Sequence, residues 1–232
     1  MEDIKENLRL IRQRINSAAE RAERDPASIR LVAVSKRHDV QAVLRALEAG
    51  QLIFGENYLQ EAREKIEKVK RVPGLNWHFI GHLQSNKAGQ AACLFDMIET
   101  VDRLKLAKAL DRYAGEARRI LPVLIQVNIG REEQKAGVNP EETEELISRV
   151  KEFPALRVRG LMTMPPQRND PEEVRPWFRE LRLMAEDFRS KGLFAEDNRV
   201  ELSMGMSHDF ETAIEEGATL VRVGTAIFGS RL

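Results

Sequence analysis

The chain opens with a stretch whose apolar residues recur at helical spacing. The apolar positions are Ile4, Leu8, Ile11, Ile15 and Ala18, with mostly charged or polar residues between them. Residues at this spacing share one face of an α-helix, so the pattern predicts an amphipathic helix with one buried face. Asp25 followed by Pro26 predicts that this helix stops near that point, because proline cannot continue a helix.

After this helix, short apolar stretches alternate with longer segments of helical pattern. The predicted strands are residues 31–36, 52–57, 76–81, 97–102, 122–128, 157–164, 200–205 and 220–224. The segments between them are rich in Ala, Leu, Glu, Lys and Arg, and some end at a glycine suited to a helix C-terminus, such as Gly50 and Gly217. Strict alternation of strands and helices predicts a parallel sheet with helices on its outside. Eight such repeats in 232 residues favour a closed (β/α)8 TIM barrel over an open sheet.

The predicted barrel is a single domain over residues 1–232. No linker, low-complexity tract or charge block marks a second domain. Only about eight residues follow the last predicted strand, which is too few for a full eighth helix. We therefore expect the N-terminal helix to occupy the position of the missing one.

Composition and charge narrow the class of protein further. Lys plus Arg and Asp plus Glu each number 37, so the formal net charge is zero and the basic excess of a nucleic-acid or membrane-surface protein is missing. The single cysteine, Cys93, excludes an intramolecular disulfide framework and suits a reducing compartment. No apolar run approaches the ~20 residues that span a bilayer, and the acid-rich N-terminus is unlike a targeting segment. These features predict a cytoplasmic, soluble protein.

In barrels of this kind, function collects at the carboxyl ends of the strands. Lys36 ends the first predicted strand, after the apolar run Leu31 to Val34. One interpretation is a lysine that only snorkels from a strand end into solvent. The other is an amine desolvated at the barrel mouth, which lowers its pKa and leaves a neutral nucleophile able to condense with an aldehyde.

The ends of the seventh and eighth predicted strands carry glycines. Such barrels often bind phosphate at the loops after these two strands, and Gly205 and Gly224 would let a ligand approach the backbone closely. Ser207 is placed to cap a helix that begins near Asp209, and N–H groups there and at Gly224 and Thr225 could receive a dianion. Alternatively, these glycines only form turns and Ser207 is only a cap.

Arg222 lies inside the last predicted strand, where an unpaired guanidinium would be costly. It could pair with a nearby acid such as Glu201. Alternatively, it faces the barrel mouth and donates to a ligand nitrogen. Because arginine does not give up its proton, a pyridine nitrogen facing it would stay unprotonated, and such a ring is a poor electron sink.

Other combinations of reactive residues carry weaker signals. His78 and His82 are four residues apart but lie on a predicted strand and turn without the glutamate of a zinc helix, so no metal site is expected. The run Ser207-His208-Asp209 contains triad residue types, yet sequence neighbours cannot adopt triad geometry. The remaining set is apolar and is interpreted as core or barrel lining: Trp77, Phe79, Trp177, Met162, Met164, Met204 and Met206.

Taken together, these motifs resemble the YggS/PROSC family of pyridoxal phosphate homeostasis proteins. The matching segments run in order along nearly the whole chain: LVAVSK, FGENYLQEAREK, WHFIGHLQSNK, VLIQVNIG, GLMTM, LSMGMSHDFETAIEEG and VRVGTAIFGSRL. The family resembles the barrel domain of alanine racemase and other fold-type III enzymes that use pyridoxal 5′-phosphate (PLP). The resemblance implies that Lys36 forms a Schiff base with PLP, that Arg222 faces the pyridine nitrogen and that Asn57 lies near the ring. It also implies a set of residues around the phosphate: Ser203, Met206, Ser207, Gly224 and Thr225.

One position departs from that pattern. Many bacterial relatives carry a second lysine two positions after the Schiff-base lysine, whereas this chain has His38. Any role of such a lysine in passing the cofactor on is therefore in doubt here. We hypothesise that a neutral His38 imidazole accepts the proton exchanged during imine transfer.

The sequence favours a carrier or buffer of PLP over a catalyst. A racemase needs an acid/base group on each face of the substrate α-carbon, and Lys36 could serve only one face. Of the two tyrosines, Tyr58 follows the second predicted strand and Tyr113 lies within a predicted helix. The leading hypothesis is a monomeric PLP homeostasis protein that supplies PLP-requiring apo-enzymes. The alternatives are a PLP-dependent amino-acid racemase or lyase, and an aldolase that uses Lys36 without a cofactor.

Overall fold

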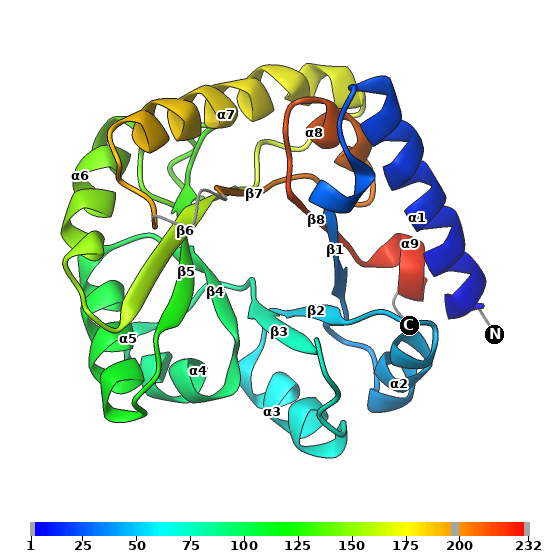
Figure 1. The fold of residues 1–232 in the computed structure, drawn as a ribbon, viewed down its shortest axis with the longest axis horizontal. Coiled ribbons are helices and arrows are strands. Elements are labelled where there is room, and N and C mark those ends of the chain that lie inside the picture. Colours follow the sequence, from blue (N-terminus) through cyan, green and yellow to red (C-terminus); the bar gives the residue numbers. More distant parts are fainter. Residues whose placement is uncertain (1–2, 196–199, 230–232) are drawn as a thin grey trace.

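The computed structural model describes residues 3–195 and 200–229, and its strands form a closed parallel barrel in sequence order from β1 to β8. The strands are β1 (Arg30–Val34), β2 (Ile53–Glu56), β3 (Asn76–Phe79), β4 (Met97–Val101), β5 (Leu121–Val127), β6 (Leu156–Thr163), β7 (Glu201–Ser203) and β8 (Leu220–Val223). Figure 1 looks down the barrel, with the strands at its centre and the helices around them. The predicted barrel is confirmed, and its strands differ from the predicted ranges mainly in ending earlier.

Helices lie on the outside of the barrel, the first before β1, the last after β8 and the others between consecutive strands. They are α1 (Ile4–Arg21), α2 (Val40–Glu48), α3 (Leu59–Lys68), α4 (Ala88–Leu94), α5 (Leu104–Glu116), α6 (Pro140–Lys151), α7 (Arg175–Ser190), α8 (Phe210–Glu215) and α9 (Thr225–Phe228). Short 3-10 helices lie at η1 (Pro26–Ser28), η2 (Ser85–Lys87) and η3 (Pro171–Val174). Gly50 and Gly217 follow α2 and α8 with φ values of 78° and 104°, the left-handed conformation that favours glycine after a helix. Ser230 to Leu232, the end of the last matching segment, lie outside the described residues.

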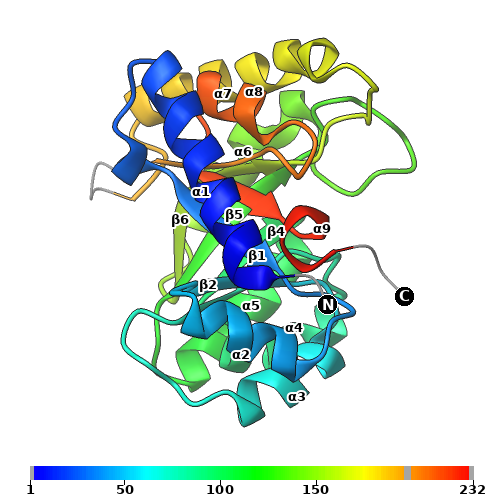
Figure 2. The same cartoon turned by 90° about the vertical axis from the view of Figure 1, so that its right-hand side faces the viewer.

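The N-terminal helix α1 takes the place that a full eighth helix would fill. It contacts α8, α9 and α2, and Figure 2 shows it crossing the outside of the barrel in front of β1. Its buried residues include Leu8 and Ile15, as the helical spacing predicted. The helix ends at Arg21, earlier than the predicted Asp25-Pro26, because the chain turns through Glu23, whose φ is 54°.

The apolar residues form two cores. The larger core lies between the strands and the helices and includes Phe54 and Phe178. The smaller core fills the inside of the barrel with Val32, Met97, Leu124, Met162 and Leu220. Because strand residues alternate in direction, side chains two positions beyond this inner core point into the barrel nearer its carboxyl end.

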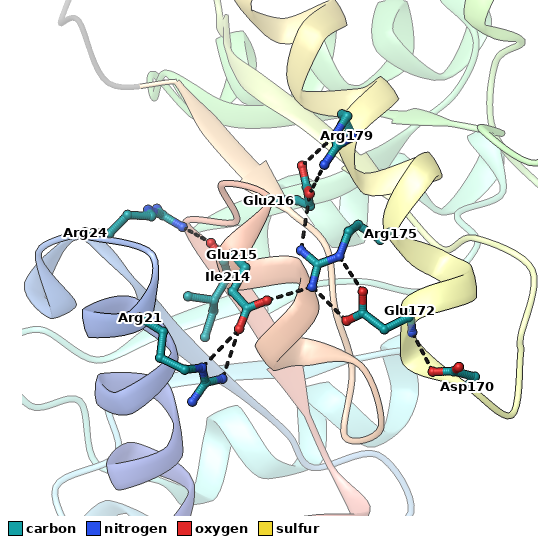
Figure 3. Close-up of polar contacts among 9 residues, drawn as sticks. All are labelled: Arg21, Arg24, Asp170, Glu172, Arg175, Arg179, Ile214, Glu215 and Glu216. Carbon is teal, nitrogen blue, oxygen red and sulfur yellow. Dashed lines mark hydrogen bonds and ion pairs between the residues drawn. The ribbon is translucent and has the colours of Figure 1, made fainter.

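An ion-pair cluster joins α1, α7 and α8. Arg175 bonds Glu172, Glu215 and Glu216, as Figure 3 shows. Arg179 bonds Glu216 as well, and Arg21 bonds Glu215 across from α1. These bonds fix α8, the helix that follows the loop after β7.

Candidate functional site

The predicted site residues gather around one cavity at the carboxyl ends of the strands. The cavity has a volume of about 270 Å³. The described residues that line it are Val34, Lys36, His38, Asn57, Ile80, Met164, Pro165, Gln167, Arg168, Met206, Ser207, His208, Asp209, Arg222, Gly224 and Thr225. Its volume lies just below the about 300–1,000 Å³ common for small-molecule sites, which suits a compact ligand.

Lys36 reaches the cavity because of the alternation along β1. Val32 belongs to the inner core and Val34 lines the cavity, so every second residue of this strand faces inward. Lys36 continues that alternation one step past the end of β1 and is half-buried among the lining residues. The interpretation as a lysine at the barrel mouth therefore fits better than one in which the side chain leaves the barrel.

Arg222 lies on β8 and is almost fully buried, with 3% of its surface exposed. Its Nη1 donates to Ser203 Oγ over 2.6 Å, and its Nη2 donates to the Thr163 carbonyl over 2.8 Å. The alternative of a pair with Glu201 is wrong, because Glu201 pairs with Arg30 over 2.6 Å. Burial lowers the pKa of the guanidinium, an effect that nearby carboxylates oppose. Arginine nevertheless keeps its charge in proteins, so the cavity has a fixed cation in its floor.

A layer of buried polar side chains separates the inner apolar core from the cavity. Glu99 Oε1 lies 2.6 Å from His78 Nδ1, and Ser203 Oγ donates to Glu99 Oε2. Burial acts to raise the pKa of Glu99, but the His78 contact, the Arg222 charge and the Ser203 bond outweigh it and lower that pKa. Glu99 is thus held as a carboxylate beneath Arg222.

Ser203 is the one predicted site residue that does not appear among the described lining residues. Its side chain is fully buried, and its hydroxyl is engaged by both Glu99 and Arg222. It supports the cavity floor from below. A direct contact between Ser203 and a phosphate, which the resemblance implied, has no support in this arrangement and stays a prediction.

The loop after β7 forms one wall of the cavity. Gly205 has a φ of 90°, and a Cβ there would lie 2.6 Å from Ala213 Cβ and 2.9 Å from Phe210 Cα, so the tight turn requires glycine. The prediction that Ser207 caps the next helix is wrong, because Asp209 holds the N-cap position of α8. Asp209 Oδ1 accepts a hydrogen bond from the Met206 N–H over 2.6 Å, and this bond closes a turn within the loop. Burial raises the pKa of Asp209 despite this bond.

Gly224 and Thr225 form the neighbouring wall, after β8. A Cβ on Gly224 would come within 3.2 Å of the Val34 carbonyl oxygen, so glycine lets β8 and β1 approach closely beside the cavity. Thr225 is exposed and begins the short helix α9.

Asn57 enters the cavity from the end of β2. Its Oδ1 is buried and has no hydrogen-bond partner among the described residues. A buried acceptor without a partner is costly, so this atom is suited to a ligand or a bound water. Gly81 lies against it, and a Cβ there would meet the Asn57 carbonyl oxygen at 2.3 Å.

Several residues that line the cavity were not predicted from the sequence. Pro165, Gln167 and Arg168 lie after β6 and were not singled out. Met164 and Met206, which were interpreted as barrel lining, are each 38% exposed and line the cavity, whereas Met204 belongs to the larger outer core. The polar residues that follow GLMTM, such as Gln167 and Arg168, could have indicated a loop that contributes to the site. His38 lines the cavity and packs against Phe228 with ring centroids 5.1 Å apart.

Neither tyrosine is among the described residues that line the cavity. Tyr58 is 47% exposed and accepts a long hydrogen bond of 3.4 Å from Arg37 Nη2. Tyr113 lies on α5 beneath the Arg112 guanidinium, 4.2 Å from the ring centroid. The part of the chain that the structure describes also contains no cluster of three His, Cys, Asp or Glu suited to a metal ion. No described helix is long and apolar enough to cross a membrane.

Comparison with known proteins first defines the class. The family described as "Alanine racemase, N-terminal domain" matches residues 2–232. An alanine racemase from Clostridium difficile 630 shares the fold, with a TM-score of 0.76, 14% identity, and coverage of 97% of this chain and 56% of the racemase. The site therefore lies in an alanine-racemase-like barrel.

Closer relatives then give the particular family. "Pyridoxal phosphate homeostasis protein" from Escherichia coli (strain K12) is 46% identical over 100% of this chain and 98% of its own length. The protein of that name from Aquifex aeolicus is 42% identical over 97% of both chains. PipY from Synechococcus elongatus PCC7942, solved with PLP bound, is 36% identical with a TM-score of 0.84, covering 97% of this chain and 100% of PipY. The chain belongs to the family of pyridoxal phosphate homeostasis proteins, and the predicted resemblance is confirmed.

Proposed function

We propose that this chain binds PLP through Lys36 and carries or buffers it as part of intracellular PLP homeostasis, without robust catalytic turnover. The observation that carries the proposal is that a lysine and a buried arginine line the same small cavity. Lys36 enters from the end of β1, and Arg222 is fixed in the floor by Ser203 and the Thr163 carbonyl. The names of the relatives and the PLP in PipY support the same function.

The side chains of the cavity fit the groups of PLP. A lysine amine forms a C=N bond to an aldehyde carbon with loss of one water, and this linkage is the chemistry that bound PLP supplies. The fixed cation of Arg222 can donate to an unprotonated ring nitrogen. Asn57 Oδ1, buried without a partner among the described residues, offers an acceptor near the ring.

The phosphate is assigned to the loops after β7 and β8, with Met206, Ser207, Gly224 and Thr225 as its surroundings. All four line the cavity. Gly205 lets the loop after β7 pack against Phe210 and Ala213, and Gly224 lets β8 approach Val34 beside the cavity. Ser203 is proposed as a residue that acts through Arg222, since its hydroxyl already bonds Arg222 and Glu99.

The alternative of an amino-acid racemase or lyase has less support from the cavity. A second acid/base group opposite Lys36 is needed for racemisation. Tyr58 is exposed and Tyr113 lies on α5, and neither is among the described lining residues. His38 and Asp209 also line the cavity, and incubation with single amino acids tests whether either acts as that second group.

Further parts of the proposal rest on composition and resemblance. We propose that residues 1–232 act as one domain, as a monomer in the cytoplasm, and that PLP-requiring apo-enzymes receive the cofactor. The zero net charge and the single cysteine, Cys93, are consistent with that setting.

A transfer experiment tests the function. Protein loaded with PLP and freed of excess ligand is mixed with an apo-enzyme that requires PLP, and the activity of the recipient is followed. We expect the recipient to gain activity as the visible absorbance of the loaded protein falls. The same loaded protein, incubated with single D- and L-amino acids, should leave their configuration unchanged. Retained cofactor with rapid scrambling of configuration would favour the racemase instead.

A further inference from the structure

Lys65 is a buried lysine on an outer helix. It lies on α3, faces the barrel and is only 3% exposed, although lysines are almost never fully buried unless they are paired. Its ammonium donates to three oxygens: the Ser35 carbonyl at 2.6 Å, Glu56 Oε1 at 2.7 Å and Glu61 Oε1 at 2.6 Å. We call Lys65, Glu56, Glu61 and Ser35 the Lys65 cluster.

The Lys65 cluster holds the main chain on both sides of Lys36. On one side, the Ser35 carbonyl accepts from Lys65, and the Ser35 hydroxyl donates to Glu56 Oε1 over 2.7 Å. On the other side, the Arg37 N–H donates to Glu61 Oε1, which Lys65 also binds. The residue before Lys36 and the residue after it are thus connected to one ammonium.

Arg37 shows why this turn needs support. Its φ is 63°, in the left-handed region that residues other than glycine rarely adopt. Such a conformation persists where the surrounding structure enforces it, often beside functional residues. The bond from the Arg37 N–H to Glu61 is a contact that enforces it here.

The cluster acts from outside the barrel. Ser35 and Glu56 are fully buried and lie on the outward side of the alternation in which Val34 and Lys36 face the cavity. None of the four cluster residues is among the described residues that line the cavity. A buried ion pair usually stabilises a protein no more than well-packed apolar residues would. The presence of the Lys65 cluster is therefore better explained by the main-chain geometry that it imposes around Lys36.

We propose that Lys65 is a positioning residue that, with Glu56 and Glu61, sets the direction in which Lys36 enters the cavity. The inference rests on the proposed function, because it gives the cluster the task of presenting the amine that binds PLP.

The test compares three variants in the full chain. Lys65→Met alone would leave Glu56 buried without its cation, so the double variant Lys65→Met/Glu56→Gln removes both charges and protects folding. Glu61→Ala removes the acceptor of the Arg37 N–H at a position whose side chain is 27% exposed. Lys68→Met changes an exposed lysine on the same helix and is the matched control.

Two measurements separate positioning from a general loss of structure. The first is hydrogen exchange at residues 35–38 in protein without PLP, and the second is the rate of adduct formation on Lys36 after PLP is added, measured across pH. In the double variant we expect faster exchange at Arg37 and adduct formation slowed by about tenfold, with a displaced pH profile. Glu61→Ala, which removes the acceptor of the Arg37 N–H itself, should speed exchange at Arg37 at least as much and also slow adduct formation, whereas Lys68→Met should match the unaltered protein.

The outcomes distinguish the inference from the function beneath it. Unchanged exchange and unchanged adduct rates in both the double variant and Glu61→Ala would overturn the positioning role, while the Lys36 adduct in unaltered protein would leave the proposed function standing. If the unaltered protein itself formed no adduct on Lys36, the proposed function would fall, and the positioning role with it.

Discussion

Arg222 donates from Nη1 to Ser203 Oγ over 2.6 Å, and this bond connects two neighbouring strands of the barrel just below the cavity. The Ser203 hydroxyl in turn donates a hydrogen bond to Glu99 Oε2, so Ser203 links the guanidinium to a buried carboxylate. The direction of Arg222 is therefore determined by the protein before any ligand enters.

Ser203→Ala is expected to weaken this support. The variant leaves an Arg222 N–H without its acceptor and Glu99 Oε2 without its donor, both in the interior. Loss of a partner at buried polar groups costs about 1–3 kcal/mol, which urea denaturation would measure as a lower free energy of unfolding. The control is Ser148→Ala on the exposed face of α6, where a change within about 0.5 kcal/mol is expected. Equal losses in the two variants would contradict the role of Ser203.

Glu216 makes stability depend on pH. Its burial acts to raise its pKa, but hydrogen bonds from Arg179 and Arg175 outweigh that effect and lower the pKa (Figure 3). A carboxyl group with a lowered folded-state pKa adds stability at neutral pH and loses it as pH falls through that pKa. Glu216→Gln should thus be less stable than the unaltered protein at pH 7, by about 1–2 kcal/mol, and the difference should shrink below about pH 4. Thermal unfolding across pH measures this, and a difference that stays constant with pH would refute it.

The fold could be predicted largely from the sequence because local pattern determines it. Apolar alternation and helix-forming segments identified all eight strands and the N-terminal helix. The polar contacts of the interior could not be predicted in the same way. Ser203 and Glu99 are far apart in the chain, and only the closed barrel brings their side chains together.

One local prediction was wrong and one buried residue was missed, for a similar reason. Ser207 was a suitable cap by residue type, but Asp209 took the N-cap position and bonded the Met206 N–H instead. The burial of Lys65 could not be predicted, because a lysine on an amphipathic helix is normally solvated. Lys65 is buried because it bonds Glu56 and the Ser35 carbonyl. That these two residues face outward from the barrel follows from the register of β1 and β2, which the sequence pattern does not give.

His38→Ala tests the exchange of the imine proton. If the imidazole accepts that proton, the variant should load and release PLP more slowly at neutral pH, by about tenfold or more. Stopped-flow absorbance measures both rates, and thermal unfolding checks for loss of the packing between His38 and Phe228. His82→Ala, at a histidine whose side chain is 57% exposed, is the control. Unchanged loading and release in His38→Ala would rule the hypothesis out.

Lys36→Ala should separate covalent attachment from the other contacts with the cofactor. The variant should lose the visible absorbance of the imine yet retain weaker binding of PLP, because the surroundings proposed for the phosphate are untouched. Equilibrium dialysis gives the remaining affinity, and Lys70→Ala at an exposed position serves as the control. A full visible band in Lys36→Ala would mean that another amine carries the cofactor.

The most direct test of the account reduces the PLP-loaded protein with borohydride and maps its peptides by mass spectrometry. Reduction fixes any imine as a stable amine, so the modified residue can be identified. We expect one pyridoxyl-phosphate adduct, on the peptide that contains Lys36. Protein that carries no adduct after incubation with excess PLP, or an adduct on a different lysine, would contradict the central claim.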